Sequence, residues 1–314
     1  MLAALISITV FAHLILPALF LFWIFKSKAR TKAQWFSIVA LVGSYLLMMW
    51  QGGAGWGWFG HYWPSLFLVL FLVCVTMSWS RRKTLPWIPE KRIKPWLGLI
   101  LLGAIAGLLA LGVPSTFTAR SYPKEKAINL LFPLKGGIFH IGHGGSNETM
   151  NHHYPIPAQK YALDIEKLNG FGIRANGLMP TDLEKYVIFG NEVLAPCSGE
   201  VIASETSLKE MIPPEGDKEN ILGNHIVIFC NDMSVLLAHL KQNSVQLKKG
   251  DLVEQGKVIG QVGNTGNTSE PHLHVHAVSG RHFETKEIAG KAEGVPMVFD
   301  GEFFIRNDRV KRPY

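Results

Sequence analysis

Acidic residues are almost absent from the first third of the sequence. Residues 1–113 contain one acidic side chain, Glu90, against ten Lys and Arg, which gives this part a net charge of +9. The remaining residues hold 21 basic and 23 acidic side chains, a net charge of −2. The overall charge of +7 therefore belongs to the first third alone. The part after residue 113 therefore has no excess of basic residues, which nucleic-acid binding requires, and we expect no nucleic-acid partner.

Charged residues are also missing from four apolar runs, Leu2–Phe25, Trp35–Trp50, Pro64–Trp79 and Trp96–Val113. A membrane-spanning helix needs about 20 apolar residues, and the Trp residues at the ends of the runs are typical of membrane interfaces. Charges inside a membrane usually mark transport or relay sites, so their absence favours an anchor in membrane lipid, with room for a membrane partner. A buried soluble bundle is the alternative, but such runs leave almost no polar face.

The basic residues lie in two short loops between the runs, 26–34 and 80–95. Short basic loops stay on the cytoplasmic side. The loop Gln51–His61 has no Lys, Arg, Asp or Glu and is expected outside. Four spans then place both termini outside, with the polar part in the periplasm or the cell exterior. The first run lacks a basic start and a clear cleavage site, so we expect a retained span rather than a signal peptide.

Cysteine is scarce, with three residues in the chain. Cys74 lies in an apolar run, whereas Cys197 and Cys230 lie in the part expected outside, where disulfides persist. Either a Cys197–Cys230 disulfide or two packed thiols fits this pattern. Cys197 and Ser198 lie in a turn without a nucleophile-elbow pattern, which argues against a Ser or Cys hydrolase. The glycine-rich segment 263–266 lacks the Lys and the helix of a phosphate-binding loop.

After a linker-like segment, 114–126, the pattern changes to short β-branched runs separated by Gly, Asn and Pro. Many short strands at such spacing predict an all-β sandwich or barrel-like sheet. We therefore expect a four-helix transmembrane anchor in 1–113, the linker, and an antiparallel all-β domain in 127–314. The expected strands include Tyr161–Ile165, Val193–Ala195, Gly199–Ala203, Asn224–Phe229, Ser234–His239, Val258–Val262 and His272–Ala277.

Histidine carries the strongest chemical signal, since ten of the twelve lie in residues 140–282. His272, His274 and His276 alternate along an expected strand and share one face, because side chains in a strand repeat every two residues. Three imidazoles on one face repel when protonated and need partners when neutral, so a metal is a natural reason for them. Asp164 lies inside another apolar strand, where an unpaired charge is costly. A catalytic zinc site has three protein ligands and an open position for water.

Six blocks of sequence form an ordered series: Gly190–Pro196, Ser198–Val201, Gly223–Ile228, Leu237–Leu240, Lys249–Val253, and Ile259–Thr268 running into Pro271–His274. In this order they resemble the LytM/lysostaphin-type zinc endopeptidases of bacterial cell walls, over roughly residues 134–280. The last block is the most specific. The resemblance implies one zinc ion per chain and a hydrolase that cleaves peptide bonds of peptidoglycan, and the apolar runs would anchor this enzyme in the membrane. A domain on the wall side of a bacterial membrane agrees with this substrate.

The resemblance assigns roles to particular residues. It makes His274 and Asp164 zinc ligands and makes His239 and His272 the catalytic histidines. One of the two accepts the proton of the attacking water and delivers it to the leaving amine, while the other hydrogen-bonds the developing oxyanion. Which histidine does which stays open at the level of sequence.

The third ligand is expected to be a histidine upstream of Asp164, but the usual position, four residues earlier, holds Lys160. A longer-spaced pattern, Asn-x-His followed by Gln-x-Tyr-Ala-x-Asp, matches residues 151–164. It puts the ligand at His153, with His152 as the alternative. A second departure is His276, at a position where the family often has Glu. A residue there can tune the metal site through contacts with the ligands.

Two other functions compete with an active peptidase. A degenerate LytM-like domain would bind wall peptide or regulate another wall hydrolase. Such domains typically lose ligands, whereas here all five expected positions can be filled. A membrane sensor or assembly protein would use the four spans as its working part, but the spans carry no Lys, Arg, Asp or Glu.

Overall fold

The computed structural model describes residues 2–53, 55–89, 93–111, 114–282 and 292–313. The chain divides into two compact units, Met1–Thr116 and Phe117–Tyr314. Glu90, Lys91 and Arg92 of the second basic loop lie outside the described residues, as do the last two residues of the fourth apolar run.

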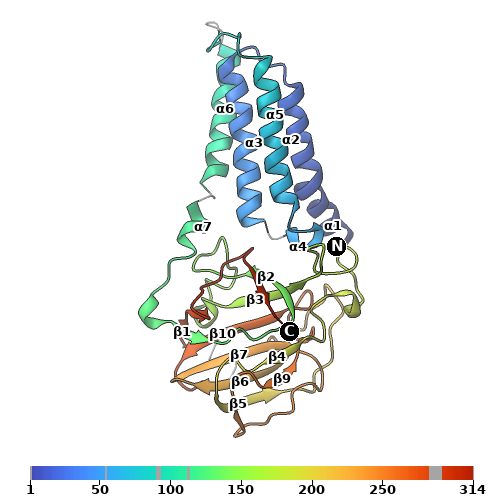
Figure 1. Cartoon of the computed structure of the whole chain (residues 1–314), viewed down its shortest axis with the longest axis vertical. Helices are drawn as coiled ribbons and strands as arrows, with labels where there is room; N and C mark the ends of the chain where they lie inside the picture. The colour runs from blue at the N-terminus through green and yellow to red at the C-terminus, as the bar shows by residue number, and fades with distance from the viewer. Residues whose placement is uncertain (1, 54, 90–92, 112–113, 283–291, 314) are drawn as a thin grey trace. The chain divides into compact units, whose positions relative to one another are not determined.

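The first unit consists of helices that follow the four apolar runs (Figure 1). Four helical segments are long and apolar enough to cross a membrane, Leu2–Lys26, Lys32–Gly52, Trp63–Ser80 and Trp96–Thr118. This confirms the predicted helical region with four candidate spans. Its elements are α1 (Leu2–Val10), the π-helical turn η1 (Phe11–Ile15), α2 (Leu16–Lys26), α3 (Lys32–Gly52), α4 (Trp56–Phe59), α5 (Trp63–Ser80), α6 (Ile93–Ala110) and α7 (Pro114–Thr118).

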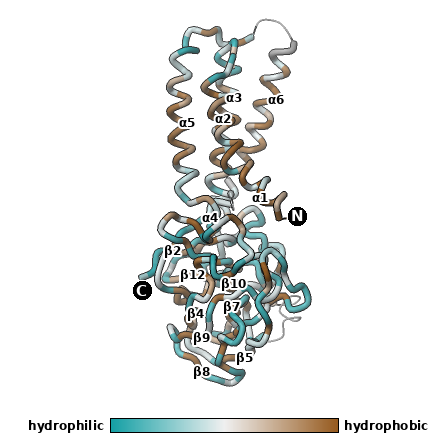
Figure 2. Tube along the Cα trace, turned by 90° about the vertical axis from the view of Figure 1, so that its right-hand side faces the viewer, coloured by the Kyte–Doolittle hydropathy of each residue, from teal (hydrophilic) through white to brown (hydrophobic). Residues whose placement is uncertain are grey.

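These helices turn apolar side chains both inward and outward. Ile24 and Val42 are fully buried in the contact between α2 and α3. Leu72, Ile100 and Leu108 are 61%, 65% and 69% exposed, and the hydrophobic colour runs along α2, α3, α5 and α6 in Figure 2. A soluble bundle would present a polar outer face. The apolar outer surface instead matches helices that lipid surrounds.

The second unit is built around an antiparallel sheet, as the sequence predicted. The strand order is β13-β2-β3-β10-β7-β6-β5-β8, with β11 also paired to β10. The strands are β2 (Gly137–His143), β3 (Leu163–Leu168), β5 (Gly199–Glu205), β6 (Asn224–Cys230), β7 (Met233–Leu240), β8 (Leu252–Val253), β10 (Leu273–Ser279), β11 (Gly294–Val295) and β13 (Arg309–Arg312). This confirms the predicted antiparallel β domain.

Two small ladders and four short helical turns complete the described part of this unit. β1 (Ile128–Leu130) pairs in parallel with β12 (Met297–Phe299), and β4 (Glu192–Leu194) pairs antiparallel with β9 (Val258–Gln261). The helical turns are the end of α7 and η2 (Lys124–Lys126), η3 (Pro157–Gln159) and η4 (Leu183–Lys185).

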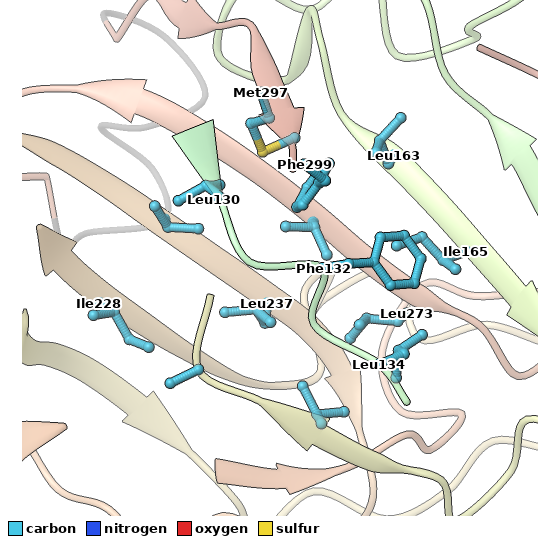
Figure 3. Packing of buried hydrophobic residues seen from close by; sticks show 14 of the residues in the cluster. Leu130, Phe132, Leu134, Leu163, Ile165, Ile228, Leu237, Leu273, Met297 and Phe299 are labelled. Carbon is cyan, nitrogen blue, oxygen red and sulfur yellow. The ribbon is translucent and has the colours of Figure 1, made fainter. Parts of the chain in front are cut away.

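The main sheet has two different faces because its side chains alternate. Leu163 and Ile165 of β3, with Leu273 of β10, point into a core closed by Phe132 and Phe299 (Figure 3). The residues that alternate with them along each strand therefore point to the opposite face. On β3 and β10 this opposite face carries the carboxylates and imidazoles that the sequence singled out.

A disulfide joins Cys197, just before β5, to Cys230 at the end of β6. Both cysteines are buried, and they are 33 residues apart in sequence. The structure thus decides between the two alternatives that the sequence left open. Cys74 remains a free thiol in α5.

Replacing both Cys197 and Cys230 with Ala is expected to lower the free energy of unfolding of the second unit. A cross-link that closes a loop of this length stabilises by about 3–4 kcal/mol, because it restricts the unfolded chain. Amide hydrogen exchange of β5 and β6 in the full chain measures the loss. Cys74→Ala is the control and should leave this exchange unchanged. Equal protection with and without the two cysteines would contradict the prediction.

Candidate metal and catalytic site

Asp164 and His274 are brought together by the pairing of β3 with β10. The register of this antiparallel pair places His274 directly opposite Asp164. Residues opposite each other in a ladder share a face of the sheet. His274 Nδ1 lies 2.8 Å from Asp164 Oδ1, and both residues are buried.

His153 reaches the same carboxylate from the loop between β2 and β3. Its Nε2 lies 3.1 Å from Asp164 Oδ1 and 3.0 Å from Oδ2. His152 contacts other imidazoles instead, with ring centroids 4.0 Å from His143 and 3.8 Å from His153. Of the two candidates from the sequence, His153 is the one whose nitrogen meets both Asp164 oxygens.

Asn151 holds this loop in place. Its side-chain amide donates to the backbone carbonyls of Gly145, Lys160 and Ala162, and its Oδ1 accepts from the backbone N–H of His153. Asn151 is fully buried. The Asn-x-His spacing in the sequence pattern thus has a physical reason, because the asparagine ties the ligand loop to both of its ends.

His239 is aimed by an irregularity in the sheet. The register between β6 and β7 shifts between Asn224 and Ile226, which leaves an extra residue on β7. His239 has φ +61°, a left-handed conformation that is uncommon outside glycine. Bulges and strained residues of this kind re-aim side chains near active sites. The His239 ring lies 4.8 Å from that of His272 and 5.9 Å from that of His274.

Backbone carbonyls fix the tautomers of His239 and His272. His239 Nδ1 lies 2.8 Å from the carbonyl oxygen of Thr265, and His272 Nδ1 lies 2.9 Å from that of Glu270. A carbonyl can only accept, so each Nδ1 carries the proton and donates it. Each Nε2 therefore holds a lone pair when the ring is neutral. His272 Nε2 is 3.6 Å from Asp164 Oδ1.

The protonation states suit a metal site. Burial alone would raise the pKa of Asp164, but His153, His272 and His274 outweigh it and hold that pKa well below its usual range. Burial lowers the pKa of His274 to about 3, and burial with two neighbouring imidazoles holds that of His239 well below its usual value. At neutral pH these groups are a carboxylate and neutral imidazoles, the forms that bind metals.

The charge of Asp164 acts in the opposite direction on His153. Burial lowers the pKa of His153, but the Asp164 carboxylate and a hydrogen bond from the ring to Gln159 more than offset it, so that the pKa is raised. A metal at this site would therefore compete with a proton mainly at His153.

The donor set fits zinc. One ligand atom each from His153, Asp164 and His274 lies within 4.8 Å of the others. Zinc bonds of about 2.0–2.1 Å in a tetrahedral arrangement separate ligand atoms by about 3.3 Å, close to the 2.8 and 3.0 Å seen between the imidazole nitrogens and the Asp164 oxygens. Two imidazoles and one carboxylate also match the nitrogen and oxygen ligands of catalytic zinc. His239, His272 and His274 form a second such group within the described residues.

A third group of donors, His143, His152 and Asp164, is less suited to a metal. Arg306 Nη2 lies 2.7 Å from His143 Nδ1. A guanidinium can only donate, so His143 accepts at Nδ1 and carries its proton at Nε2. The nitrogen left for a metal is thus protonated, and the positive charge of Arg306 stands beside it. Sequence reasoning missed this contact because Arg306 lies 163 residues further along the chain.

Residues 184–285 match the model of peptidase family M23. The chain carries an M23 peptidase domain. The M23 match includes His239, His272 and His274 but begins after His153 and Asp164. The resemblance to LytM/lysostaphin-type enzymes is thereby confirmed, and the M23 family is zinc-dependent.

Parts of this chain are similar to solved structures of peptidases. A zinc-containing peptidase from Vibrio cholerae is 30% identical over 28% of this chain and 24% of its own length, with a TM-score of 0.23. The catalytic domain of the antimicrobial peptidase lysostaphin from Staphylococcus simulans is 24% identical over 38% of this chain and 85% of its own, with a TM-score of 0.25. A longer lysostaphin chain is 18% identical over 56% of this chain and 51% of its own length, with a TM-score of 0.27.

This chain thus spans about a quarter of the Vibrio protein and about half of the longer lysostaphin chain. A search of curated proteins found no match.

Replacing His153 with Ala is expected to remove most of the zinc from the purified full chain, because His153 Nε2 is the nitrogen nearest to both Asp164 oxygens. Loss of one of three protein ligands leaves the metal weakly held. His152→Ala is the matched neighbour and should keep its zinc. Metal content by atomic absorption compares the two variants, and a greater loss in His152→Ala would reverse the ligand assignment.

Proposed function

We propose that this chain is a membrane-anchored zinc metalloendopeptidase that hydrolyses peptide bonds of bacterial peptidoglycan. The observation that carries the proposal is the Asp164 carboxylate, with His153 and His274 against its two oxygens and a second pair of imidazoles beside it. His153, Asp164 and His274 would hold one zinc ion per chain. The M23 match and the apolar helices support this function.

When bound, zinc would polarise the scissile carbonyl and lower the pKa of a water molecule toward 7. His272 is the better placed acceptor for the proton of the attacking water. Its Nε2 lone pair is free of the backbone, and Asp164, 3.6 Å away, stabilises the positive charge that forms on the ring. The same nitrogen then delivers the proton to the leaving amine.

His239 plays a different part because it is more deeply buried and its pKa is held low. In its neutral form its Nε2 can only accept a hydrogen bond, since Nδ1 donates to Thr265. It orients the attacking water by accepting from it. It becomes a donor to the developing oxyanion only when it carries a second proton. Both histidines have the same tautomer, so it is the Asp164 carboxylate, 3.6 Å from His272 Nε2, that assigns the first proton to His272.

The competing function is an inactive domain that binds wall peptide or regulates another hydrolase. His153, His272 and His274 surround the Asp164 carboxylate and His239 packs against two of them, and the tautomers of His239 and His272 are fixed for proton transfer. A domain that only binds peptide has no need of either feature. The geometry therefore favours catalysis.

His272→Ala is expected to lower kcat for cleavage of purified wall peptide by 100-fold or more, roughly the contribution of a general base. Its zinc content should not change, because His272 is proposed as an acid–base group and not as a ligand. The assay uses zinc-loaded full chain in detergent, and His282→Ala, beyond the end of β10, is the control. A zinc-loaded wild type that binds wall peptide without cleaving it would favour the regulatory alternative.

We also propose the topology and the domain limits that the charge pattern predicts. The four spans lie in residues 1–113, the linker is 114–126, and the peptidase domain, 127–314, faces the periplasm or the cell exterior. The basic loops 26–34 and 80–95 face the cytoplasm, following the preference of short basic loops. This side of the membrane is where peptidoglycan lies.

A membrane-impermeant thiol reagent tests this topology in intact cells. In a chain with Cys74→Ala, Ile212→Cys in the peptidase domain is expected to be labelled, because its position is exposed and outside. Lys28→Cys in the first basic loop should be labelled only after the membrane is permeabilised. Labelling of Lys28→Cys in intact cells would invert the proposed orientation.

A further inference from the structure

His276 is a buried histidine that the proposed mechanism does not use. It follows His274 by two residues on β10, so both side chains lie on the same face of the sheet. Opposite it in the ladder is Leu236 of β7, which belongs to an apolar cluster with Ala238 and Val278. His276 is 1% exposed. An apolar side chain of similar size would suit these surroundings better than an imidazole.

The polar contact of His276 is with His274. His276 Nδ1 lies 2.9 Å from His274 Nε2, and His274 Nδ1 lies 2.8 Å from Asp164 Oδ1. The three side chains form one line from the carboxylate into the apolar cluster. At its inner end, the Nε2 of His276 is buried and has no hydrogen-bond partner among the residues that the structure describes.

The positions of the protons on the two rings are linked. A neutral imidazole carries one proton, and a hydrogen bond between two rings needs a donor on one side and a lone pair on the other. If His276 donates from Nδ1, His274 accepts at Nε2 and its own proton lies on Nδ1. His274 then has no lone pair to offer beside Asp164.

The reverse arrangement makes His274 a metal ligand. If the proton of His274 lies on Nε2, it is donated to Nδ1 of His276, and Nδ1 of His274 is a lone pair aimed at the site. The proton of His276 then lies on its Nε2, the atom that is buried without a partner. When His274 Nδ1 is free to bind a metal, His276 therefore carries an unsatisfied N–H at its Nε2.

We propose that His276 is a positioning residue, which fixes the tautomer and the ring orientation of His274 so that His274 Nδ1 binds zinc. The proposal rests on the zinc assignment made under Proposed function. It explains why an imidazole persists in an apolar cluster where it leaves a polar atom unpaired. Partners that orient a ligating histidine in this way typically change metal affinity 10–100-fold when they are removed.

Zinc affinity of the purified full chain, measured by competition with a chelator, tests the proposal. His276→Phe keeps a planar aromatic ring but removes the acceptor, and should weaken zinc binding 10–100-fold. His276→Gln keeps an acceptor oxygen and should retain most of the affinity. His282→Phe, three residues beyond the end of β10, is the control and should bind like the wild type. Equal affinity of His276→Phe and wild type overturns the proposal, as does an equal loss in His276→Gln.

Thermal unfolding in excess chelator separates positioning from a structural role. His276→Phe removes the unpaired His276 Nε2 but leaves His274 Nε2 without a partner, so its melting temperature without zinc should stay close to that of the wild type. A histidine kept for packing would give a lower melting temperature together with weaker zinc binding, and that pair of results overturns the proposal.

Nitrogen-15 NMR of the zinc-loaded wild type tests the same claim without a variant, should His276→Phe not fold. Both His274 and His276 are expected to carry their protons on Nε2, and a proton on His276 Nδ1 overturns the inference. A wild type that binds no zinc contradicts the proposed function as a whole. If the wild type binds zinc and cleaves peptide, and His276→Phe binds zinc equally well, the result contradicts this inference but not the proposed function.

Discussion

The Asp164 carboxylate, buried on one face of an antiparallel sheet, is the charge around which the second unit is arranged. An isolated carboxylate in such a place would take up a proton. Here His153 and His274 touch its two oxygens and His272 lies at 3.6 Å, so the carboxylate stays ionised. The same charge raises the pKa of His153, so Asp164 and His153 each favour the charged form of the other.

The sheet makes this arrangement possible because one of its faces is apolar and the other carries the polar groups of the site. The face toward Phe132 and Phe299 is a continuous apolar core, which fixes the register of β3 against β10. A slip of one residue would turn Asp164 and His274 into that core, at a large cost in free energy. The packing of Leu163, Ile165 and Leu273 therefore determines where the polar groups on the other face meet.

Much of this was predictable from the sequence, for reasons that are local. The sequence pattern predicted strands at Tyr161–Ile165 and His272–Ala277, where β3 and β10 lie, and the uncharged runs predicted the four candidate spans. The features that could not be predicted depend on contacts between distant segments. The Arg306–His143 contact joins residues 163 apart, and the left-handed conformation of His239 follows from the register shift beside β6. No local pattern records either one.

The site also joins parts of the chain that are far apart in sequence. His153 and Asp164 come before the segment that matches the M23 family, whereas His239, His272 and His274 lie within it. Asp164 and His274 are 110 residues apart and meet only when β3 pairs with β10. A metal held by both would bind the folded sheet and not the unfolded chain, so it would stabilise this pairing by mass action. The apolar core aligns the two strands, and the shared metal would then hold the alignment. A metal bound there would therefore couple binding to the folding of the second unit through Asp164.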